Sequence, residues 1–247
     1  MKRLKVAAAT VCGVGVAALG AGQAKADIGV PSYVPSSGLG PVTPAATTNS
    51  FYGGYEGGKP FSGVPSVGST FIVPKFKCPV DALNFYGAAI FDSQGFFQAG
   101  ASLSIECAGG VASYGLNAET ALDNDDEVGV KPGDKIIVSL SETASDTTAT
   151  AADVTSGVSA YADDGVGDAT GNPSANFNIG VFDDSGTTPQ YKSIVFSNDK
   201  VNAIPLGLLR PRAQALDLMS GSDIQEKTSK IKGINHASFT MTYVNTQ

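Results

Sequence analysis

The sequence is short of several residues that common kinds of site require. Its 247 residues include no tryptophan, one histidine and three cysteines. Only 16% of the residues are charged, where about 25% is usual in soluble proteins. The formal net charge is −7, and no basic stripe offsets it. The chain therefore lacks the electrostatic pattern of a nucleic-acid-binding protein, and we expect no nucleic-acid partner.

The scarcity of histidine and cysteine excludes two kinds of chemistry. His236 is the only histidine, and no G-x-S-x-G motif supplies a serine nucleophile, so a Ser-His-Asp triad is not expected. Zinc sites draw on several His or Cys ligands, which this chain lacks. We expect no metal and no cofactor, with His236 on the surface at the start of the last strand. The absence of tryptophan weakens a sugar-stacking groove without excluding one, because tyrosine also stacks.

The first 26 residues have the three-part pattern of a secretory signal. Basic residues in the first five positions precede an apolar stretch over 6–19 and an A-x-A cleavage site at 24–26. The stretch is short for a membrane span, and no later segment has ~18 uninterrupted apolar residues. We expect a secreted, extracellular protein that starts at Asp27 and has no membrane span. A retained N-terminal anchor is the alternative.

Removal of the signal would leave two cysteines, Cys78 and Cys107, because Cys12 lies within the signal. Two cysteines in an oxidising compartment most simply form one disulfide. Two buried free thiols are the alternative.

The rest of the chain has two parts. Residues 27–50 contain four prolines among Ser, Gly and Thr, which predicts an extended N-terminal arm. Residues 51–247 contain short β-like runs between turn signals, with apolar residues alternating at 136–141 and 238–243. We predict one all-β domain, an antiparallel two-sheet β-sandwich of about ten to twelve strands. A possible helical turn at 212–219 is the only helical signal after residue 26.

Two acidic clusters stand out, at Asn124–Glu127 and Asp163–Asp168. Grouped carboxylates can bind Ca²⁺, but neither cluster has the spacing of an EF-hand loop. We therefore expect solvated acidic loops, with calcium binding as the alternative.

A set of segments carries a resemblance to a known family. The segments, in order, are 68–74 (GSTFIVP) with 78–79 (CP), 97–100 (FQAG), 110–119 (GVASYGLNAE), 130–136 (VKPGDKI), 194–198 (IVFSN) and 238–243 (SFTMTY). Together they resemble the motifs of the glutamic peptidases, or eqolisins, over most of residues 50–244. The resemblance implies a secreted acid protease fold, a concanavalin A-like double β-sheet of jelly-roll type.

The resemblance also implies a site without metal or histidine. In the family, a glutamate acts as general base on water and a glutamine amide stabilises the oxyanion. Gln98 matches that glutamine, and Glu119 matches a second acidic residue of the same region. Asn176 and Gly180 stand where the resemblance expects two glutamates, which implies that Gly180 replaces the catalytic one. We therefore expect a degenerate active site.

Three functions remain open. The first is a monomeric extracellular binding module that holds a peptide, glycan or surface partner in the sheet cleft. The second is an acid endopeptidase in which Gln98 stabilises the oxyanion and Glu119 or another acid is the general base. The third is a structural, surface-associated protein.

Overall fold

The structure, a computed structural model, describes residues 47–57, 66–165, 174–209, 213–232 and 237–244. All of them belong to one compact unit, within Ser32–Gln247. His236 and Asp168 lie outside the described residues. Nowhere in those ranges is there a helix with the length and apolar character needed to cross a membrane.

The described residues form sixteen strands and one short 3-10 helix. Their bounds are β1 (Thr47–Asn49), β2 (Tyr52–Gly57), β3 (Ser66–Ile72), β4 (Ala82–Asp92), β5 (Phe97–Ala108), β6 (Val111–Thr120), β7 (Asn124–Val128), β8 (Lys135–Glu142), β9 (Thr147–Asp153), β10 (Ser159–Asp163), β11 (Ser174–Asp183), β12 (Ile194–Val201), β13 (Ile204–Pro205), η1 (Leu206–Leu209), β14 (Ala213–Ser220), β15 (Asp223–Thr228) and β16 (Ser238–Tyr243).

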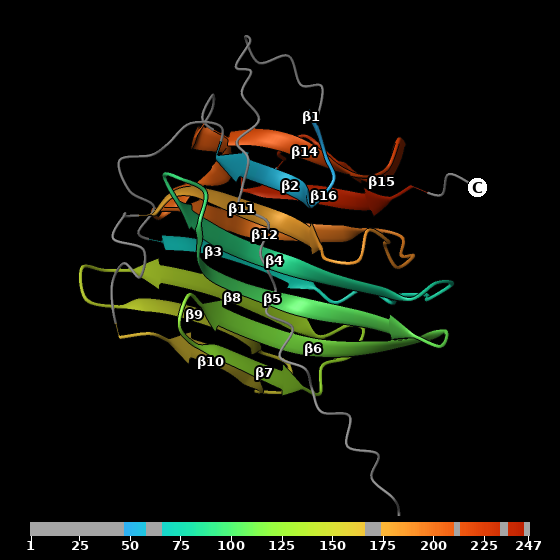
Figure 1. Ribbon diagram of the computed structural model, residues 1–247, viewed down its shortest axis with the longest axis horizontal. Helices are drawn as coiled ribbons and strands as arrows, with labels where there is room; N and C mark the ends of the chain where they lie inside the picture. The colour runs from blue at the N-terminus through green and yellow to red at the C-terminus, as the bar shows by residue number, and fades with distance from the viewer. Residues whose placement is uncertain (1–46, 58–65, 166–173, 210–212, 233–236, 245–247) are drawn as a thin grey trace, which may run out of the picture. The chain divides into compact units, whose positions relative to one another are not determined.

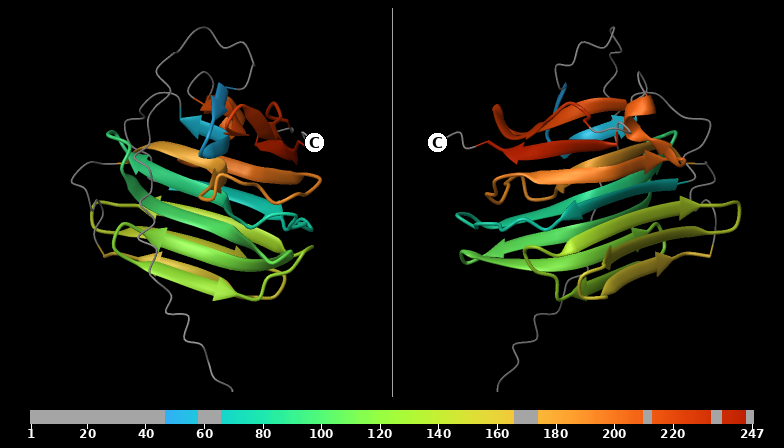
Figure 2. Two further views of the ribbon diagram at one scale, coloured as in Figure 1. Left: turned by 45° about the vertical axis from the view of Figure 1, so that its right-hand side comes forward. Right: turned by 180° about the vertical axis from the view of Figure 1, so that it is seen from behind.

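The strands form one continuous sheet that folds back on itself into two layers (Figures 1 and 2). The first layer has the order β14-β2-β11-β4-β5-β6-β7, and the second has the order β15-β16-β12-β3-β8-β9-β10. Strands β5 and β6 of the first layer pack against β8 and β9 of the second. The predicted antiparallel sandwich is confirmed, with a single parallel pair, β1 with β14, among the described strands.

Alternation of apolar and polar residues explains the layers. In β8, Ile136, Val138 and Leu140 are fully buried between the layers, while Lys135 and Ile137 face outward. The turn before β8 contains Pro132 and Gly133, one of the turn signals of the sequence. Asp134 N–H donates to the Lys131 carbonyl at 3.1 Å, and φ of Gly133 is 98°.

Several elements differ from the sequence prediction. There are sixteen strands rather than about ten to twelve. The possible helical turn at 212–219 is wrong, because Ala213–Ser220 is strand β14. The acidic run Asn124–Glu127 belongs to strand β7 rather than to a loop. Strand β1 lies within the segment assigned to the arm, so regular structure begins before residue 51.

The acidic residues beside β7 connect the free edges of the two layers. An Asp125 carboxylate oxygen accepts from the backbone N–H of Tyr161 in β10 at 2.9 Å. An Asp123 oxygen accepts from the N–H of Asp163 at 3.1 Å. These side chains occupy donors that would otherwise be unpaired at a sheet edge.

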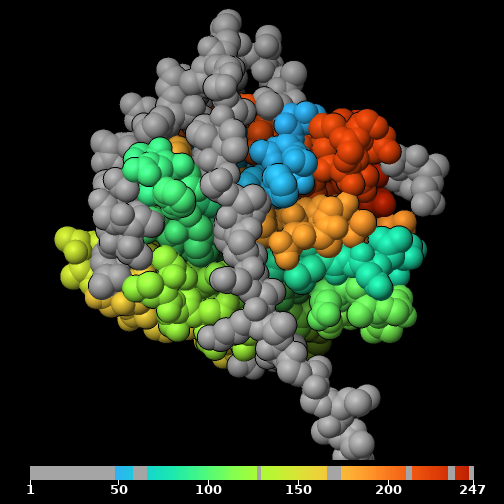
Figure 3. All heavy atoms as spheres, in the orientation of Figure 1, coloured from blue at the N-terminus to red at the C-terminus, as the bar shows by residue number. Residues whose placement is uncertain are grey.

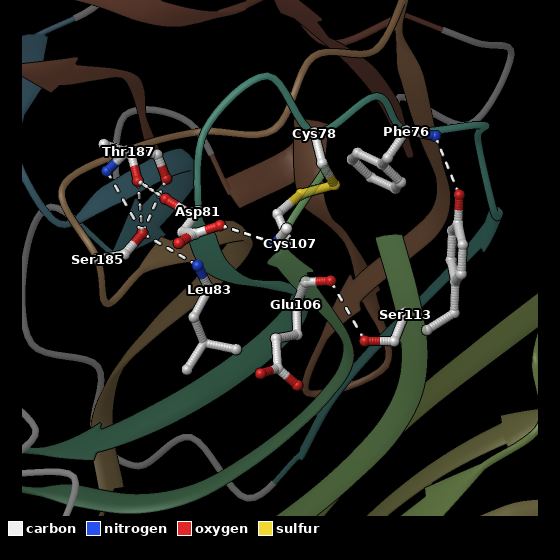
Figure 4. The surroundings of a disulfide bond; sticks show 11 residues. Phe76, Cys78, Asp81, Leu83, Glu106, Cys107, Ser113, Ser185 and Thr187 are labelled. Carbon is white, nitrogen blue, oxygen red and sulfur yellow. Dashed lines mark hydrogen bonds between the residues drawn. A yellow bond between two sulfur atoms is a disulfide. The ribbon is translucent and has the colours of Figure 1, made fainter. Parts of the chain in front are cut away.

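The predicted disulfide joins Cys78 to Cys107 across 29 residues, with their Cα atoms 5.3 Å apart. Cys107 lies in β5 opposite Ala82, the first residue of β4. Asp81, next to the bridge, accepts from Gly109 N–H at 3.1 Å, and its carbonyl accepts from the Thr187 hydroxyl at 2.8 Å (Figure 4). The bond therefore fixes the entry into β4.

A glycine row crosses the first layer: Gly54 in β2, Gly180 in β11 and Gly87 in β4 are direct cross-strand partners. A Cβ at Gly180 would lie 2.1 Å from the Gly53 carbonyl oxygen, and φ there is +153°. A Cβ at Gly87 would lie 2.0 Å from the Ala101 carbonyl oxygen. Glutamate therefore cannot replace Gly180 without displacing β2. The packing of this sheet therefore requires a glycine here, and the expected loss of a catalytic glutamate at this position stays a prediction.

Replacing both Cys78 and Cys107 by alanine should lower the free energy of unfolding by about 3 kcal/mol, because the unfolded chain loses its covalent loop. Urea unfolding of the double variant measures this loss. Parent protein unfolded under reducing conditions serves as the control and should match the variant. An unchanged unfolding midpoint would contradict the expectation.

Gly180→Ala should destabilise the protein by more than about 2 kcal/mol, because the new methyl group meets backbone of β2 at an unfavourable φ. Gly68→Ala is the matched control: Gly68 also lies in a strand, but its Cβ would meet nothing closer than 3.6 Å. Thermal or urea unfolding compares the two variants. Equal losses would show that the glycine row is not a packing constraint.

Candidate functional site

The outer face of the first layer carries the residues singled out by the sequence. In β11, Phe177, Ile179 and Val181 point into the main core. The alternate residues Asn176 and Asn178 therefore lie on the outer face, in the same direction as Gly180. Figure 3 shows this side of the molecule with all atoms, and the residues of β2 (blue) lie beside those of β14 and β15 (orange-red).

Gln98 lies near the start of β5, where the pairing with β4 is irregular. Ala99 pairs with Ile90, but Phe97 pairs with Phe91, so Gln98 is the extra residue of a bulge. Its backbone carbonyl accepts from Ala121 N–H at 3.0 Å. Its side chain is 1% exposed. The bulge fixes Gln98 firmly between the ends of β4 and β6.

Glu119 lies close to Gln98 on the same face. It is directly opposite Gly100 in the β5–β6 pair, and Gly100 and Gln98 are two residues apart on one strand. Diagonal neighbours of this kind are about 7–8 Å apart. The structure therefore brings together the two residues that the sequence nominated. Their catalytic roles remain predictions.

Burial changes the acidity of Glu119. The carboxyl is half-buried, and desolvation together with the nearby Asp126 carboxylate raises its pKa. Asp126 in turn accepts a hydrogen bond from the Asn117 side chain at 2.7 Å. A carboxyl with a raised pKa can take up or release a proton closer to neutral pH than an ordinary glutamate.

The positions expected to hold glutamates carry no acid. Asn176 is buried and lies opposite Phe91 of β4. A carboxylate does occur nearby on β2: Glu56, which is 1% exposed and lies opposite Asn178. Strands are ~4.8 Å apart, so the three strand spacings from Glu56 to Gln98 amount to about 14 Å. The backbones of Glu56 and Gln98 are therefore separated by two intervening strands.

An aromatic cluster covers part of the same face. It comprises Tyr52, Phe85, Phe91, Phe97 and Phe182. The Tyr52 ring is 5.4 Å from that of Phe182 and 5.9 Å from that of Phe91. Phe85 is 6.0 Å from Phe182, and Phe91 is 6.2 Å from Phe97. Tyr52 and Phe91 are buried although they lie outside the main core, while Phe85, Phe97 and Phe182 are half-buried.

The glycine row and two rings of the aromatic cluster lie on the same face of β2 and β11. Tyr52 and Gly54 lie on one face of β2, and Phe182 and Gly180 lie on the same face of β11. Glycine leaves the sheet surface bare, so large rings can lie over it, as aromatic residues do beside strand glycines. Sequence reasoning missed both Glu56 and this cluster. The alternation of Tyr52, Gly54 and Glu56 along one strand was the available signal.

A separate acidic cluster gathers near Asp123, at the end of β6 that also carries Glu119. Carboxylate oxygens of Asp146, Asp163 and Asp164 lie within 4.8 Å of one another. A hydrogen bond between Asp146 and Asp163 raises the pKa of the first and lowers that of the second. Exposed acidic groups of this kind are common without an ion, so the cluster does not by itself distinguish solvated acids from a calcium site.

Comparison with known proteins identifies the fold. No family model matches the chain, and no curated protein matches it. Among solved structures, scytalido-glutamic peptidase with a transition state analog inhibitor is similar at TM-score 0.60 and 18% identity, over 80% of this chain and 100% of that one. SCP-B, an eqolisin in complex with the tripeptide Ala-Ile-His, is similar at TM-score 0.61 and 16% identity, with the same coverage. The chain has the fold of the eqolisin, or glutamic, peptidases.

Proposed function

We propose that this protein is a secreted, catalytically silent eqolisin-like module that binds an extended peptide on the outer face of its first layer. The aromatic cluster is the observation that carries the proposal. Phe85, Phe97 and Phe182 present half-buried rings beside the buried amides of Asn176 and Asn178. Apolar walls with a few fixed polar groups are typical of ligand sites. The rings suit apolar side chains of a peptide, and the amides suit its backbone.

Two observations argue against catalysis. An asparagine, Asn176, stands where the resemblance calls for a glutamate, and a carboxamide cannot act as a general base. Gly180 has no room for any side chain, because its Cβ would meet the Gly53 carbonyl oxygen. The remaining outer-face acid on β2, Glu56, is about 14 Å from Gln98.

Secretion is part of the same proposal. The N-terminal signal pattern over 1–26 and the Cys78–Cys107 bond both suit an oxidising compartment. Peptide binding also agrees with the fold, because the similar SCP-B structure contains a tripeptide.

An acid endopeptidase is the second candidate. It is favoured by one observation, the diagonal placement of Glu119 and Gln98 together with the raised pKa of Glu119. In that mechanism Glu119 would activate a water, and the Gln98 amide would donate a hydrogen bond to the oxyanion.

Binding is tested with the full chain and a library of labelled peptides, beside a glycan array. Phe85→Ala and Phe182→Ala should each weaken peptide binding about tenfold or more, because each removes a ring from the site. Ile72→Ala is the control, since Ile72 is 51% exposed on β3 in the second layer. Failure to retain any peptide, or retention of glycans alone, would overturn the proposal.

Cleavage is tested by incubating the same protein with a denatured substrate from acid to neutral pH. We expect no cleavage above a blank. The informative variant is Glu119→Gln, and Glu106→Gln is its control, because Glu106 is an exposed glutamate on β5. Cleavage by the parent that falls at least 100-fold in Glu119→Gln but persists in Glu106→Gln would establish the peptidase instead.

A further inference from the structure

A group of polar side chains lies inside the sandwich, on the face of β4 opposite to the aromatic cluster. Asn84 and Tyr86 point inward from β4, and both are fully buried. Asp183 of β11 is the direct cross-strand partner of Asn84 and is 1% exposed. Glu226 of β15 is also fully buried. Four strand residues from three strands therefore bring two carboxyls and an amide into the interior.

Four of the seven polar side-chain atoms in this group have no hydrogen-bond partner among the described residues. The Tyr86 hydroxyl donates to Glu226 Oε1 at 2.9 Å. Asp183 Oδ1 accepts from the backbone N–H groups of Ser185 and Gly186, each at 3.0 Å. Within the described ranges, Glu226 Oε2, Asp183 Oδ2 and both amide atoms of Asn84 have no hydrogen-bond partner. Buried polar atoms without a protein partner point to water or an ion.

Among the residues that the structure describes, no cation acts on either carboxyl. The groups that act on Glu226 in the described part of the chain are the hydroxyls of Tyr191 and Tyr86 and the carboxyl of Asp183. Burial raises the pKa of Glu226 to about 8 and also raises that of Asp183. Buried acids without a counter-charge stay neutral or bind a cation.

The surroundings of Glu226 contain tyrosines rather than charges. Tyr86 comes from β4, Tyr191 from the segment after β11, and Tyr243 is the cross-strand partner on β16. On β14 the partner is Leu218, and on β2 the inward tyrosine is Tyr55. Asp183 is the one facing group among these that can carry a charge at neutral pH.

We propose that this interior group is a hydration site, in which ordered water bridges Asn84, Asp183 and Glu226 while Glu226 keeps its proton. Water then supplies the hydrogen bonds that these side chains lack. Glu226 Oε2–H donates to a water, and that water donates to Asp183 Oδ2 and to Asn84 Oδ1. Internal waters make about three such bonds. A second water accepts from the Asn84 amide nitrogen.

The retained proton makes stability depend on pH. Folded Glu226 holds its proton to higher pH than the unfolded chain does. Its contribution to stability is complete below the ordinary pKa of glutamate and is lost as pH rises towards about 8. This one contribution therefore favours the fold in acid and is absent at alkaline pH.

The first test compares urea unfolding of the full chain at pH 5 and pH 8. The free energy of unfolding of the parent should fall between pH 5 and pH 8. The fall should be smaller in Glu226→Gln, because glutamine cannot ionise and the contribution of one titrating carboxyl is removed. Glu106→Gln is the exposed control and should behave as the parent. Asp199 is a second buried acid, bonded to Ser69, and its pKa is raised to about 8. Because Asp199 is present in the parent and in both variants, its effect on stability is the same in each and does not affect the comparison. An identical pH dependence in Glu226→Gln would overturn the proposal.

The second test uses the parent and does not depend on the folding of a variant. A high-resolution crystal structure should show water at about 2.7–3.0 Å from the oxygen atoms of Asn84, Asp183 and Glu226 that lack a protein partner. The absence of water between these side chains would overturn the proposal. So would an ion at about 2.3–2.6 Å from the carboxyl oxygens, together with a rise in Tm on adding Ca²⁺.

Discussion

Backbone-to-backbone approach across β2, β11 and β4 is the constraint on which the first layer depends. At Gly54, Gly180 and Gly87 the neighbouring strands leave no space for a Cβ. The rings of the aromatic cluster lie on the same face of these strands and give the outer face an apolar patch. The amides of Asn176 and Asn178 lie beside that patch. A change in the glycine row would therefore alter the strand geometry and the candidate ligand site together.

Strands β4 and β11 contribute to both the outer face and the interior polar group, because successive side chains of a strand point to opposite faces. On β11, Asn176 and Asn178 face outward, while Asp183 faces the interior. On β4, Phe85 and Phe91 belong to the outer cluster, and Asn84 and Tyr86 belong to the interior group. A shift of one residue in the β4–β11 register would exchange the two environments. Correct register is thus a condition for both the surface site and the buried acids.

Much of the fold could be predicted from local pattern. The alternation in β8 and β16, the Pro132–Gly133 turn and the single cysteine pair each have a local cause that is visible in the sequence. β9 was missed because alanines and threonines, rather than large apolar residues, form its two faces. β7 was missed because its acids suggest solvent, although Asp125 serves the neighbouring strand edge.

Prediction of the site was more limited. Gln98 and Glu119 could be nominated from motif order, and the β5–β6 register brings them together. Glu56 and the glycine row could not be found in this way, because their meaning depends on which strand lies beside which. Such cross-strand register is set by long-range pairing and leaves little local trace. The same holds for Glu226, whose burial depends on Tyr86, far away in the sequence.

The carboxylates of Asp123 and Asp125 have a consequence for assembly. They occupy N–H groups on the rim of β10 and place negative charge where a foreign strand would add. An open rim is a template for growth by successive molecules, and charged side chains are a common protection against it. The acidic segment beside β7 therefore blunts an exposed strand edge as well as joining the two layers.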